Sequence, residues 1–331
     1  MSARRHDAAR RRFAFATALS AALPALPAWS TRAGAATAGL PGELRIGIQK
    51  GDALVALRAS GALERGFAGQ PVAIRWIEFV YGAPLVEAIN TGDIDVGAVG
   101  STPPILAQAG AAPAVTYVGW SPRLVSSYAI IVPPGSPARS IADLAGRRIA
   151  VARGSQGHLF ALQALADAHL DASAVTFSYL AYSDARSAFE RGFVDAWAVP
   201  DPRYADTELA TGARTLLRIG ELSVPQYGFY IAPRAFAERY PAVLRTLFDT
   251  LAAQTRTDLA HPDATARFLE RSTGVPLPVW QRALPRLEWG ARYPLDDAVI
   301  RAQQASADLA WHSRLIPHAV DVRQAIVDIR A

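Results

Sequence analysis

The stretch LVEAINTGDIDVGAVGSTPPIL, residues 85–106, holds the local pattern from which we derive the fold. Its first residues predict a helix that stops at Gly92, and the apolar run at 94–99 predicts a buried strand. A small hydroxyl residue before Pro103 then predicts the start of a second helix. Because free backbone N–H groups at a helix start attract anions, we expect Ser101 and Thr102 to lie at an anion-binding site.

A similar pattern occurs again about 100 residues later in the chain. The segment AFERGFVDAWAV (188–199) echoes residues 88–99, and RIAVARGS (148–155) echoes RIGIQKGD (45–52). This period is longer than the roughly 20 to 50 residues of solenoid repeats. The echo therefore predicts two similar α/β lobes, with chance similarity between α/β segments as the alternative.

The order of predicted elements favours an α/β protein with two lobes. We expect two doubly wound domains joined by a hinge that the chain crosses twice. Lobe I takes 39–130 plus 228–331, and lobe II takes 131–227. Ligands of such sheets lie outside the carboxyl ends of the strands. The cleft should therefore collect the loops at 49–52, 100–103, 154–158 and 199–204.

The N-terminal segment predicts export from the cytoplasm. Five arginines within residues 1–12 precede an apolar segment at 13–28 and a tract of small residues at 33–38. This order is typical of a signal peptide, here 1–38, cleaved after Ala35 or Ala38. Arg10-Arg11-Arg12-Phe13 also resembles a twin-arginine signal, so both export routes stay open. We expect a soluble, unanchored protein in the periplasm.

Charge and cysteine content exclude several classes of function. The six arginines and one aspartate of residues 1–38 account for the whole formal net charge of +5, so the mature chain is close to neutral. A neutral chain gives no support to binding of nucleic acid or anionic membranes. The sequence contains no cysteine, which excludes disulfides, thiolate metal sites and a lipid-anchored cysteine. The histidines show no metal-binding spacing, and we expect neither a metal nor a cofactor.

Four segments together resemble a known family. The segments are LRIGIQKG (44–51), EAINTGDIDVGAVGSTPP (87–104), SIADLAGRRIAVARGSQGH (140–158) and AFERGFVDAWAV (188–199), within a similarity that spans roughly 43–260. They resemble the periplasmic substrate-binding proteins of ABC transporters for aliphatic sulfonates and taurine, which are relatives of nitrate-binding proteins. The resemblance implies the two-lobed periplasmic-binding-protein fold of type II, in a monomer that closes on a small organic anion and delivers it to a membrane permease.

The resemblance also implies where the ligand binds. We expect the three sulfonate oxygens to accept hydrogen bonds from the starts of two helices, while two aromatic rings, those of Trp197 and Tyr227, flank the carbon chain. The complete set of predicted ligand-binding residues is Gln49, Gly51, Asp52, Ser101, Thr102, Ser127, Gly154, Ser155, Gln156, His158, Trp197, Asp201 and Tyr227.

Two positions depart from the family pattern. Asp52 follows the QKG segment, where relatives usually carry a small neutral residue, and it either caps a helix or pairs with an amino group on the ligand. Relatives commonly have Trp-Asp-Pro-Tyr where this chain has Pro200-Asp201-Pro202-Arg203-Tyr204. Arg203 is therefore either an exposed side chain or a fork for an oxyanion.

An enzymatic function is the main alternative, because the same fold serves a desulfinase and a pyrimidine-precursor synthase. The first requires a nucleophilic cysteine, which this chain lacks. The second requires a lysine for a pyridoxal cofactor, and Lys50 is the single lysine of the sequence. No catalytic motif of a hydrolase, zinc protease or dinucleotide-binding enzyme occurs. We therefore expect a binding protein, with a sulfonate as ligand and nitrate or a pyrimidine precursor as the alternatives.

Overall fold

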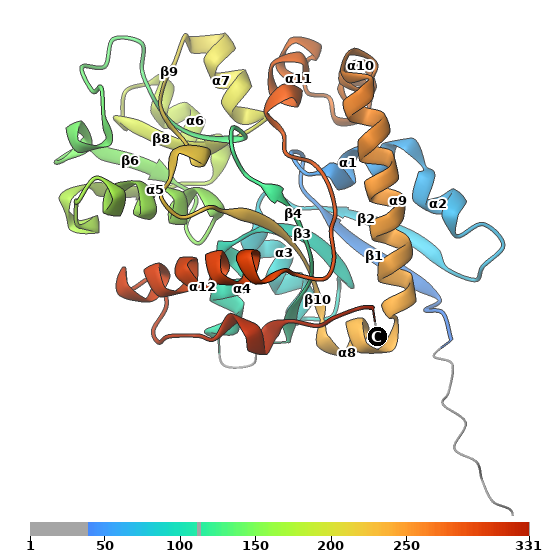
Figure 1. Ribbon diagram of the computed structural model, residues 1–331. Coiled ribbons are helices and arrows are strands. Elements are labelled where there is room, and N and C mark those ends of the chain that lie inside the picture. The colour runs from blue at the N-terminus through green and yellow to red at the C-terminus, as the bar shows by residue number, and fades with distance from the viewer. Residues whose placement is uncertain (1–38, 111–113, 331) are drawn as a thin grey trace, which may run out of the picture. The chain divides into compact units, whose positions relative to one another are not determined.

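The computed structural model describes residues 39–110 and 114–330, which form two α/β domains (Figure 1). The predicted signal peptide lies outside the described residues. The first domain contains a mixed sheet in the order β2-β1-β3-β10-β4, with β10 antiparallel to both neighbours. Its strands are β1 (Glu43–Ile48), β2 (Ala73–Glu78), β3 (Val96–Gly100), β4 (Val115–Arg123) and β10 (Tyr227–Pro233).

The second domain repeats this arrangement, with a sheet in the order β7-β6-β8-β5-β9. Here β5 is the strand that runs antiparallel to both of its neighbours. The strands are β5 (Tyr128–Val132), β6 (Arg148–Val151), β7 (Thr176–Tyr179), β8 (Ala196–Pro200) and β9 (Arg214–Arg218). The chain passes between the sheets after β4 and again after β9, so the predicted architecture of two domains with two crossings is confirmed. The division at residues 130 and 227 stays a prediction.

Helices cover both faces of the first sheet because its strands are apolar on both sides. On β10, Tyr230 and Ala232 belong to one apolar cluster, which includes α1 and α9, whereas Phe229 and Ile231 belong to a second, which includes α3, α4 and α12. The alternation follows from the two-residue period of a strand. The helices are α1 (Ala53–Ser60), α2 (Ala62–Gly66), α3 (Gly82–Asn90), α4 (Thr102–Gln108), α8 (Arg234–Arg239), α9 (Pro241–Ala260), α10 (Pro262–Thr273), α11 (Leu277–Ala283) and α12 (Asp297–His312).

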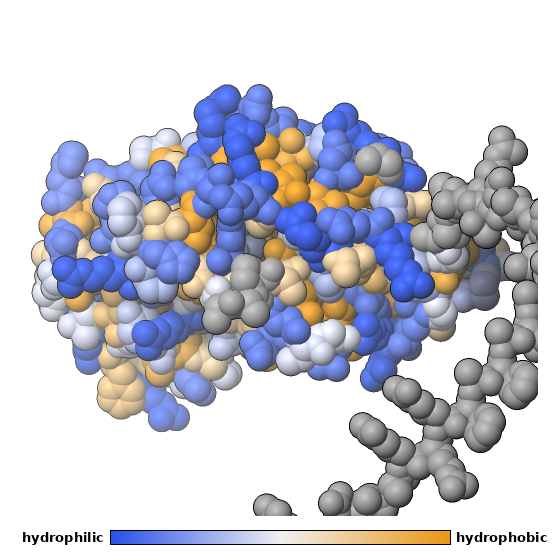
Figure 2. All heavy atoms as spheres, turned by 90° about the horizontal axis from the view of Figure 1, so that it is seen from below, coloured by the Kyte–Doolittle hydropathy of each residue, from blue (hydrophilic) through white to orange (hydrophobic). Residues whose placement is uncertain are grey.

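The second sheet is likewise covered on both faces, by α5 (Gln156–Asp167), α6 (Tyr182–Glu190) and α7 (Arg203–Thr211). Short 3-10 turns complete the chain at Ile141–Leu144, Ala172–Ala174, Ile219–Glu221, Leu284–Arg286 and Val322–Ala325. Among the described residues, no helix is both long and apolar enough to cross a membrane. One face of the protein is mostly hydrophilic, with hydrophobic patches between the polar side chains (Figure 2).

The echo in the sequence corresponds to a repeated contact in the two sheets. Asp95 precedes β3 and accepts a hydrogen bond from the backbone N–H of Arg45 at 2.8 Å. Asp195 precedes β8 and accepts one from the backbone N–H of Arg148, also at 2.8 Å. Each aspartate also contacts the side chain of its arginine, at 2.6 Å in the first pair and 3.2 Å in the second. The same sequence pattern therefore aligns the neighbouring parallel strands of each domain.

Two helices, α2 and α7, occur in segments that the sequence pattern does not identify as helical. The case of α7 matters for function, because this helix carries Arg203 at its first position. Its residues RYADTELAT include few apolar side chains, so the periodicity that reveals a buried helix is weak. Helix α7 forms behind Pro202, where the fixed backbone of proline favours a helix start.

Candidate functional site

A cavity of about 120 Å³ lies between the two domains. The loop after β1 lines it on one side, the end of β8 and the start of α7 line it on another, and residues 287–290 close a third. The domains meet closely here, because a side-chain carbon at Gly51 would lie only 2.6 Å from the backbone oxygen of Asp201. The cavity is therefore built at the carboxyl ends of parallel strands from both sheets.

Five of the predicted ligand-binding residues line this cavity: Gln49, Gly51, Asp52, Ser127 and Asp201. The amide group of Gln49 donates to the backbone oxygen of Ala98 at 2.8 Å, which holds the β1 loop against β3. The loop at 49–52 and the start of α7 therefore line the same cavity, as expected for loops at the carboxyl ends of the strands.

Three other predicted residues are buried away from the cavity, and two of them, Ser101 and Gln156, bond to each other. The backbone N–H and the hydroxyl group of Ser101 both donate to the side-chain oxygen of Gln156, at 2.5 and 2.8 Å. Ser101, Thr102 and Gln156 are 1%, 0% and 3% exposed. The side-chain oxygen of Gln156 accepts from the donors that we expected an anion to use, and this contact joins α4 of the first domain to α5 of the second.

The loop at 154–158 borders a different cavity. Gly154 and His158 line a second cavity of about 270 Å³ together with Arg153 and Tyr179. Ser155 caps α5 by accepting from the backbone N–H of His158. Burial, aided by the charge of Arg153, lowers the pKa of His158 to about 4, so the imidazole is neutral at pH 7.

Neither of the two predicted stacking rings lines the cavity between the domains. Trp197 is 1% exposed and lies in the core of the second domain, 6.2 Å from the ring of Phe189. Tyr227 packs edge-on against Trp120 with a centroid distance of 5.7 Å. The resemblance implies that both rings flank the ligand, but the alternation of side chains across β8 directs Trp197 into the core.

Five aromatic residues that sequence reasoning missed do line the cavity: Tyr128, Tyr182, Phe229, Tyr230 and Trp289. The indole N–H of Trp289 donates to the backbone oxygen of Gly51 at 2.9 Å, which attaches residues 287–290 to the β1 loop. No local signal marks Trp289, because it follows a short 3-10 turn and reaches the site only through tertiary packing.

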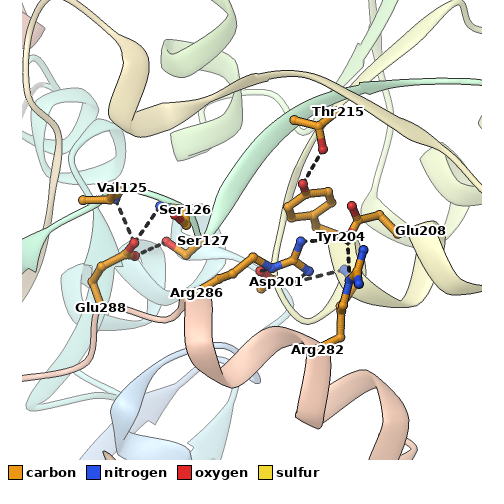
Figure 3. A network of polar contacts seen from close by, with 11 residues as sticks. Val125, Ser126, Ser127, Asp201, Tyr204, Glu208, Thr215, Arg282, Arg286 and Glu288 are labelled. Atoms are coloured by element: carbon orange, nitrogen blue, oxygen red, sulfur yellow. Dashed lines mark hydrogen bonds and ion pairs between the residues drawn. The ribbon is translucent and has the colours of Figure 1, made fainter.

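A network of charged groups connects the domains beside the cavity (Figure 3). Arg286 contacts Asp201 through two nitrogens, at 3.0 and 2.9 Å, and contacts Glu208 at 2.7 Å. The guanidinium group also lies 3.9 Å above the ring of Tyr204. The side chain of Asp201 is fully buried. Burial raises the pKa of Asp201, and the charge of Arg286 opposes that shift.

Glu288 is a further acid at the cavity wall that the sequence analysis did not identify. Its carboxylate accepts from the backbone N–H groups of Val125 and Ser126, at 2.9 and 2.6 Å, and from the Ser127 hydroxyl group at 2.6 Å (Figure 3). These three donors lie in the segment where the chain passes from β4 to β5. Glu288 therefore fixes the first crossing between the domains.

Arg203 is the cation that faces the cavity. Its guanidinium group lies 4.7 Å from the ring centroid of Tyr182 and lines the cavity. Within residues 39–110 and 114–330, this group makes no ion pair and donates no side-chain hydrogen bond. The side chain is thus positioned by an aromatic face while its five N–H donors stay available to a ligand.

The charges of Arg203, Asp52 and Glu288 all act on the hydroxyl group of Tyr128. Burial raises its pKa, the neighbouring Tyr182 adds to the increase, Arg203 lowers it, and Asp52 and Glu288 raise it again. The two acids and Arg203 therefore contribute charge to the same cavity. A polar cavity of this kind between two domains, with aromatic walls and charges of both signs, defines a binding protein for a small molecule.

Comparison with known proteins identifies the family. Residues 72–270 match the family described as "ABC transporter, phosphonate, periplasmic substrate-binding protein". The fold is similar to that of the alkanesulfonate-binding protein SsuA from Xanthomonas axonopodis pv. citri, solved with bound MOPS. That protein is 37% identical with a TM-score of 0.81, and the match covers 88% of this chain and 99% of the other.

Two further relatives agree with this match. The periplasmic aliphatic sulphonate binding protein SsuA from Escherichia coli is 35% identical, with a TM-score of 0.79 and coverage of 87% and 93% of the two chains. The taurine-binding periplasmic protein of Escherichia coli (strain K12) is 26% identical over 71% of this chain and 72% of its own length. The chain belongs to the family of periplasmic substrate-binding proteins of ABC transporters.

Proposed function

We propose that this protein captures a short aliphatic sulfonate in the cavity between its domains and delivers it to an ABC permease in the inner membrane. The observation that carries the proposal is the side chain of Arg203, which faces the cavity without an anionic partner among the described residues. A planar guanidinium group suits an oxyanion because it donates two parallel hydrogen bonds. The relatives named above, which bind sulfonates, support this choice of anion.

The size of the cavity supports a ligand with few carbon atoms. A cavity of about 150 Å³ holds benzene, which has six non-hydrogen atoms. Ethanesulfonate has the same number, and the cavity here measures about 120 Å³. Aromatic sulfonates have more non-hydrogen atoms and are therefore poorer candidates for a cavity of this size.

Binding would work through closure of the two domains. A ligand stabilises the closed form only by the contacts that it makes there and not in the open form. Arg203 belongs to the second domain, whereas Gln49 and Trp289 reach the cavity from the first-domain side, so one ligand touches both. The crossings after β4 and β9 are the natural hinge, and the lobes that we predict, 39–130 plus 228–331 and 131–227, are the parts that would move.

We propose that the protein binds its ligand without catalysing a reaction. The sequence contains no cysteine to act as a desulfinase nucleophile. Lys50, the single lysine, does not line the cavity: its ammonium group is 3.4 Å from the backbone oxygen of Thr273 and 3.9 Å from Glu78. A pyridoxal cofactor on Lys50 would therefore sit apart from the charged cavity wall. We also propose that the protein acts in the periplasm as an unanchored monomer after export.

Isothermal titration calorimetry on the chain from residue 39 to 331 tests the function. Methanesulfonate and ethanesulfonate should bind, whereas Arg203→Gln should weaken binding by about 10- to 100-fold, since a hydrogen bond to a charged group contributes about 1.5–3 kcal/mol. Arg191→Gln, which changes an exposed arginine of the same domain, should leave affinity unchanged. Binding of nitrate or a pyrimidine precursor, with none of any sulfonate, would overturn the assignment.

A further inference from the structure

A side chain of the second domain bonds to the start of a helix in the first. Gln156 is the first residue of α5, and its Oε1 atom accepts from the backbone N–H and the hydroxyl group of Ser101, at 2.5 and 2.8 Å. Ser101 stands directly before α4. Because both residues are buried, water does not compete for these bonds, and a donor that lost its partner there would be costly.

The same side chain reaches the segments where the chain passes between the sheets. The amide nitrogen of Gln156 donates to the side-chain oxygen of Gln226, which directly precedes β10 in the second crossing. The backbone oxygen of Gln226 in turn accepts from the backbone N–H of Leu124 at 2.8 Å, and Leu124 directly follows β4 in the first crossing. One glutamine therefore connects α4 to both crossings.

Ser101 is held in position by its own domain. Its backbone oxygen accepts from the side-chain amide of Gln303 on α12 at 2.8 Å. The same amide donates to the hydroxyl group of Tyr117 on β4 at 2.9 Å. The partner of Gln156 is thus fixed to a helix and a strand of the first domain, so a bond to Ser101 restrains that domain as a whole.

The contact between the domains depends on a close approach at Gly100. A Cβ atom added to Gly100 would lie 2.6 Å from the Cβ atom of Gln156, which is closer than side chains approach one another. Gly100 also lines the cavity between the domains. The side chain of Gln156 therefore packs against a residue of the cavity wall, which links closure of the domains to the shape of the cavity.

We propose that Gln156, with its partners Ser101 and Gln226, forms a latch that holds the two domains closed by contacts that need no ligand. This inference goes beyond the proposed function, because it concerns the ligand-free protein. A ligand shifts an equilibrium between open and closed forms only by its preference for one of them. A latch that raises the closed fraction leaves less of this shift to the ligand, and it therefore tightens binding of any ligand that the closed form holds.

The absence of cysteine from the sequence allows a direct test with two spin labels. Ala68→Cys and Ala145→Cys place one label at an exposed position of each domain. Pulsed electron paramagnetic resonance on the ligand-free chain from 39 to 331 should show a population at the label distance of the structure described here. In Gln156→Ala the ratio of closed to open molecules should fall at least fivefold, since one net hydrogen bond shifts an equilibrium by about fivefold. The ion pairs of Arg286 also connect the domains, so the variant should retain some closed molecules.

A control on the same helix separates the latch from the stability of α5. Gln163→Ala removes an amide that donates to Asp167 at 2.7 Å within the second domain, and it should keep the distance distribution of the unmodified protein. Ser101→Ala removes one donor from the other side of the latch and should shift the distribution in the same direction as Gln156→Ala. It provides the test on its own if Gln156→Ala does not fold.

Two results would overturn the latch: a distribution that changes in neither Gln156→Ala nor Ser101→Ala, or an equal shift in Gln163→Ala. Because the test uses no ligand, these results do not depend on the proposed function. Failure of every sulfonate to bind would overturn the proposed function and leave the latch in place.

Discussion

Removal of the Arg286 side chain should destabilise the protein strongly, because it leaves a buried carboxylate without its cation. Arg286 is 14% exposed, and its partner Asp201 is fully buried in its side chain. Breaking a buried ion pair by deleting one partner typically costs about 3–5 kcal/mol. The stacking of the guanidinium group on Tyr204, at 3.9 Å, contributes about 1 kcal/mol more. We therefore expect Arg286→Met to lose about 4–6 kcal/mol at pH 8.

The cost should depend on pH, since the stranded carboxyl group can bind a proton. Burial already raises the pKa of Asp201, and loss of the opposing Arg286 charge raises it further. A carboxyl group that binds protons more tightly in the folded state stabilises the fold at low pH, and this stability is lost as pH rises through the folded pKa. The penalty of Arg286→Met should thus be smaller at pH 5 than at pH 8.

Urea unfolding of the chain from 39 to 331, followed by tryptophan fluorescence and circular dichroism, measures both effects. Arg282→Met is the matched control, because Arg282 contacts Glu208 at 3.4 Å but is 55% exposed. Exposed ion pairs contribute about 0–1 kcal/mol, so this variant should remain close to the unmodified protein. If Arg286→Met costs no more than Arg282→Met, or if its cost does not change with pH, the reasoning about the buried pair fails.

Three further predictions concern the cavity and the core. Gly51→Ala places a carbon 2.6 Å from the backbone oxygen of Asp201 and should weaken ethanesulfonate binding at least tenfold in calorimetry, whereas Gly42→Ala, with no atom within 4 Å, should have no effect. Trp197→Ala should lower the free energy of unfolding by about 3–5 kcal/mol in urea; loss of binding with unchanged stability would instead show that Trp197 contacts the ligand. The raised pKa of Asp52 makes the fold less stable as pH rises from about 4 to about 7, so Asp52→Asn should gain melting temperature relative to the unmodified protein between pH 5 and pH 8, and parallel curves would contradict this.

The main features of the architecture were predictable because they depend on short-range patterns. A glycine turn between a helix and an apolar strand occurs in both domains, and each time an aspartate follows that binds the backbone of the neighbouring strand. Such contacts join strands that are adjacent in the sheet, so the pattern recurs in the sequence. Helix α7 was missed because few of its residues are apolar, and its start depends on Pro202 and the packing of the second domain.

The sequence by itself determined the class of protein, the two crossings between sheets and the loops that form a site at the strand ends. Tertiary structure alone decided which side chains reach the cavity. Ser101 and Gln156 were predicted to hold an anion, yet they bond to each other across the domains at 2.5 Å. Trp289 comes from a segment more than 200 residues beyond Gly51, to which it donates its indole N–H. The physical reason is that burial and pairing are properties of the packed domains. Only their packing shows that Arg203 lines the cavity without an ion-pair partner among the described residues.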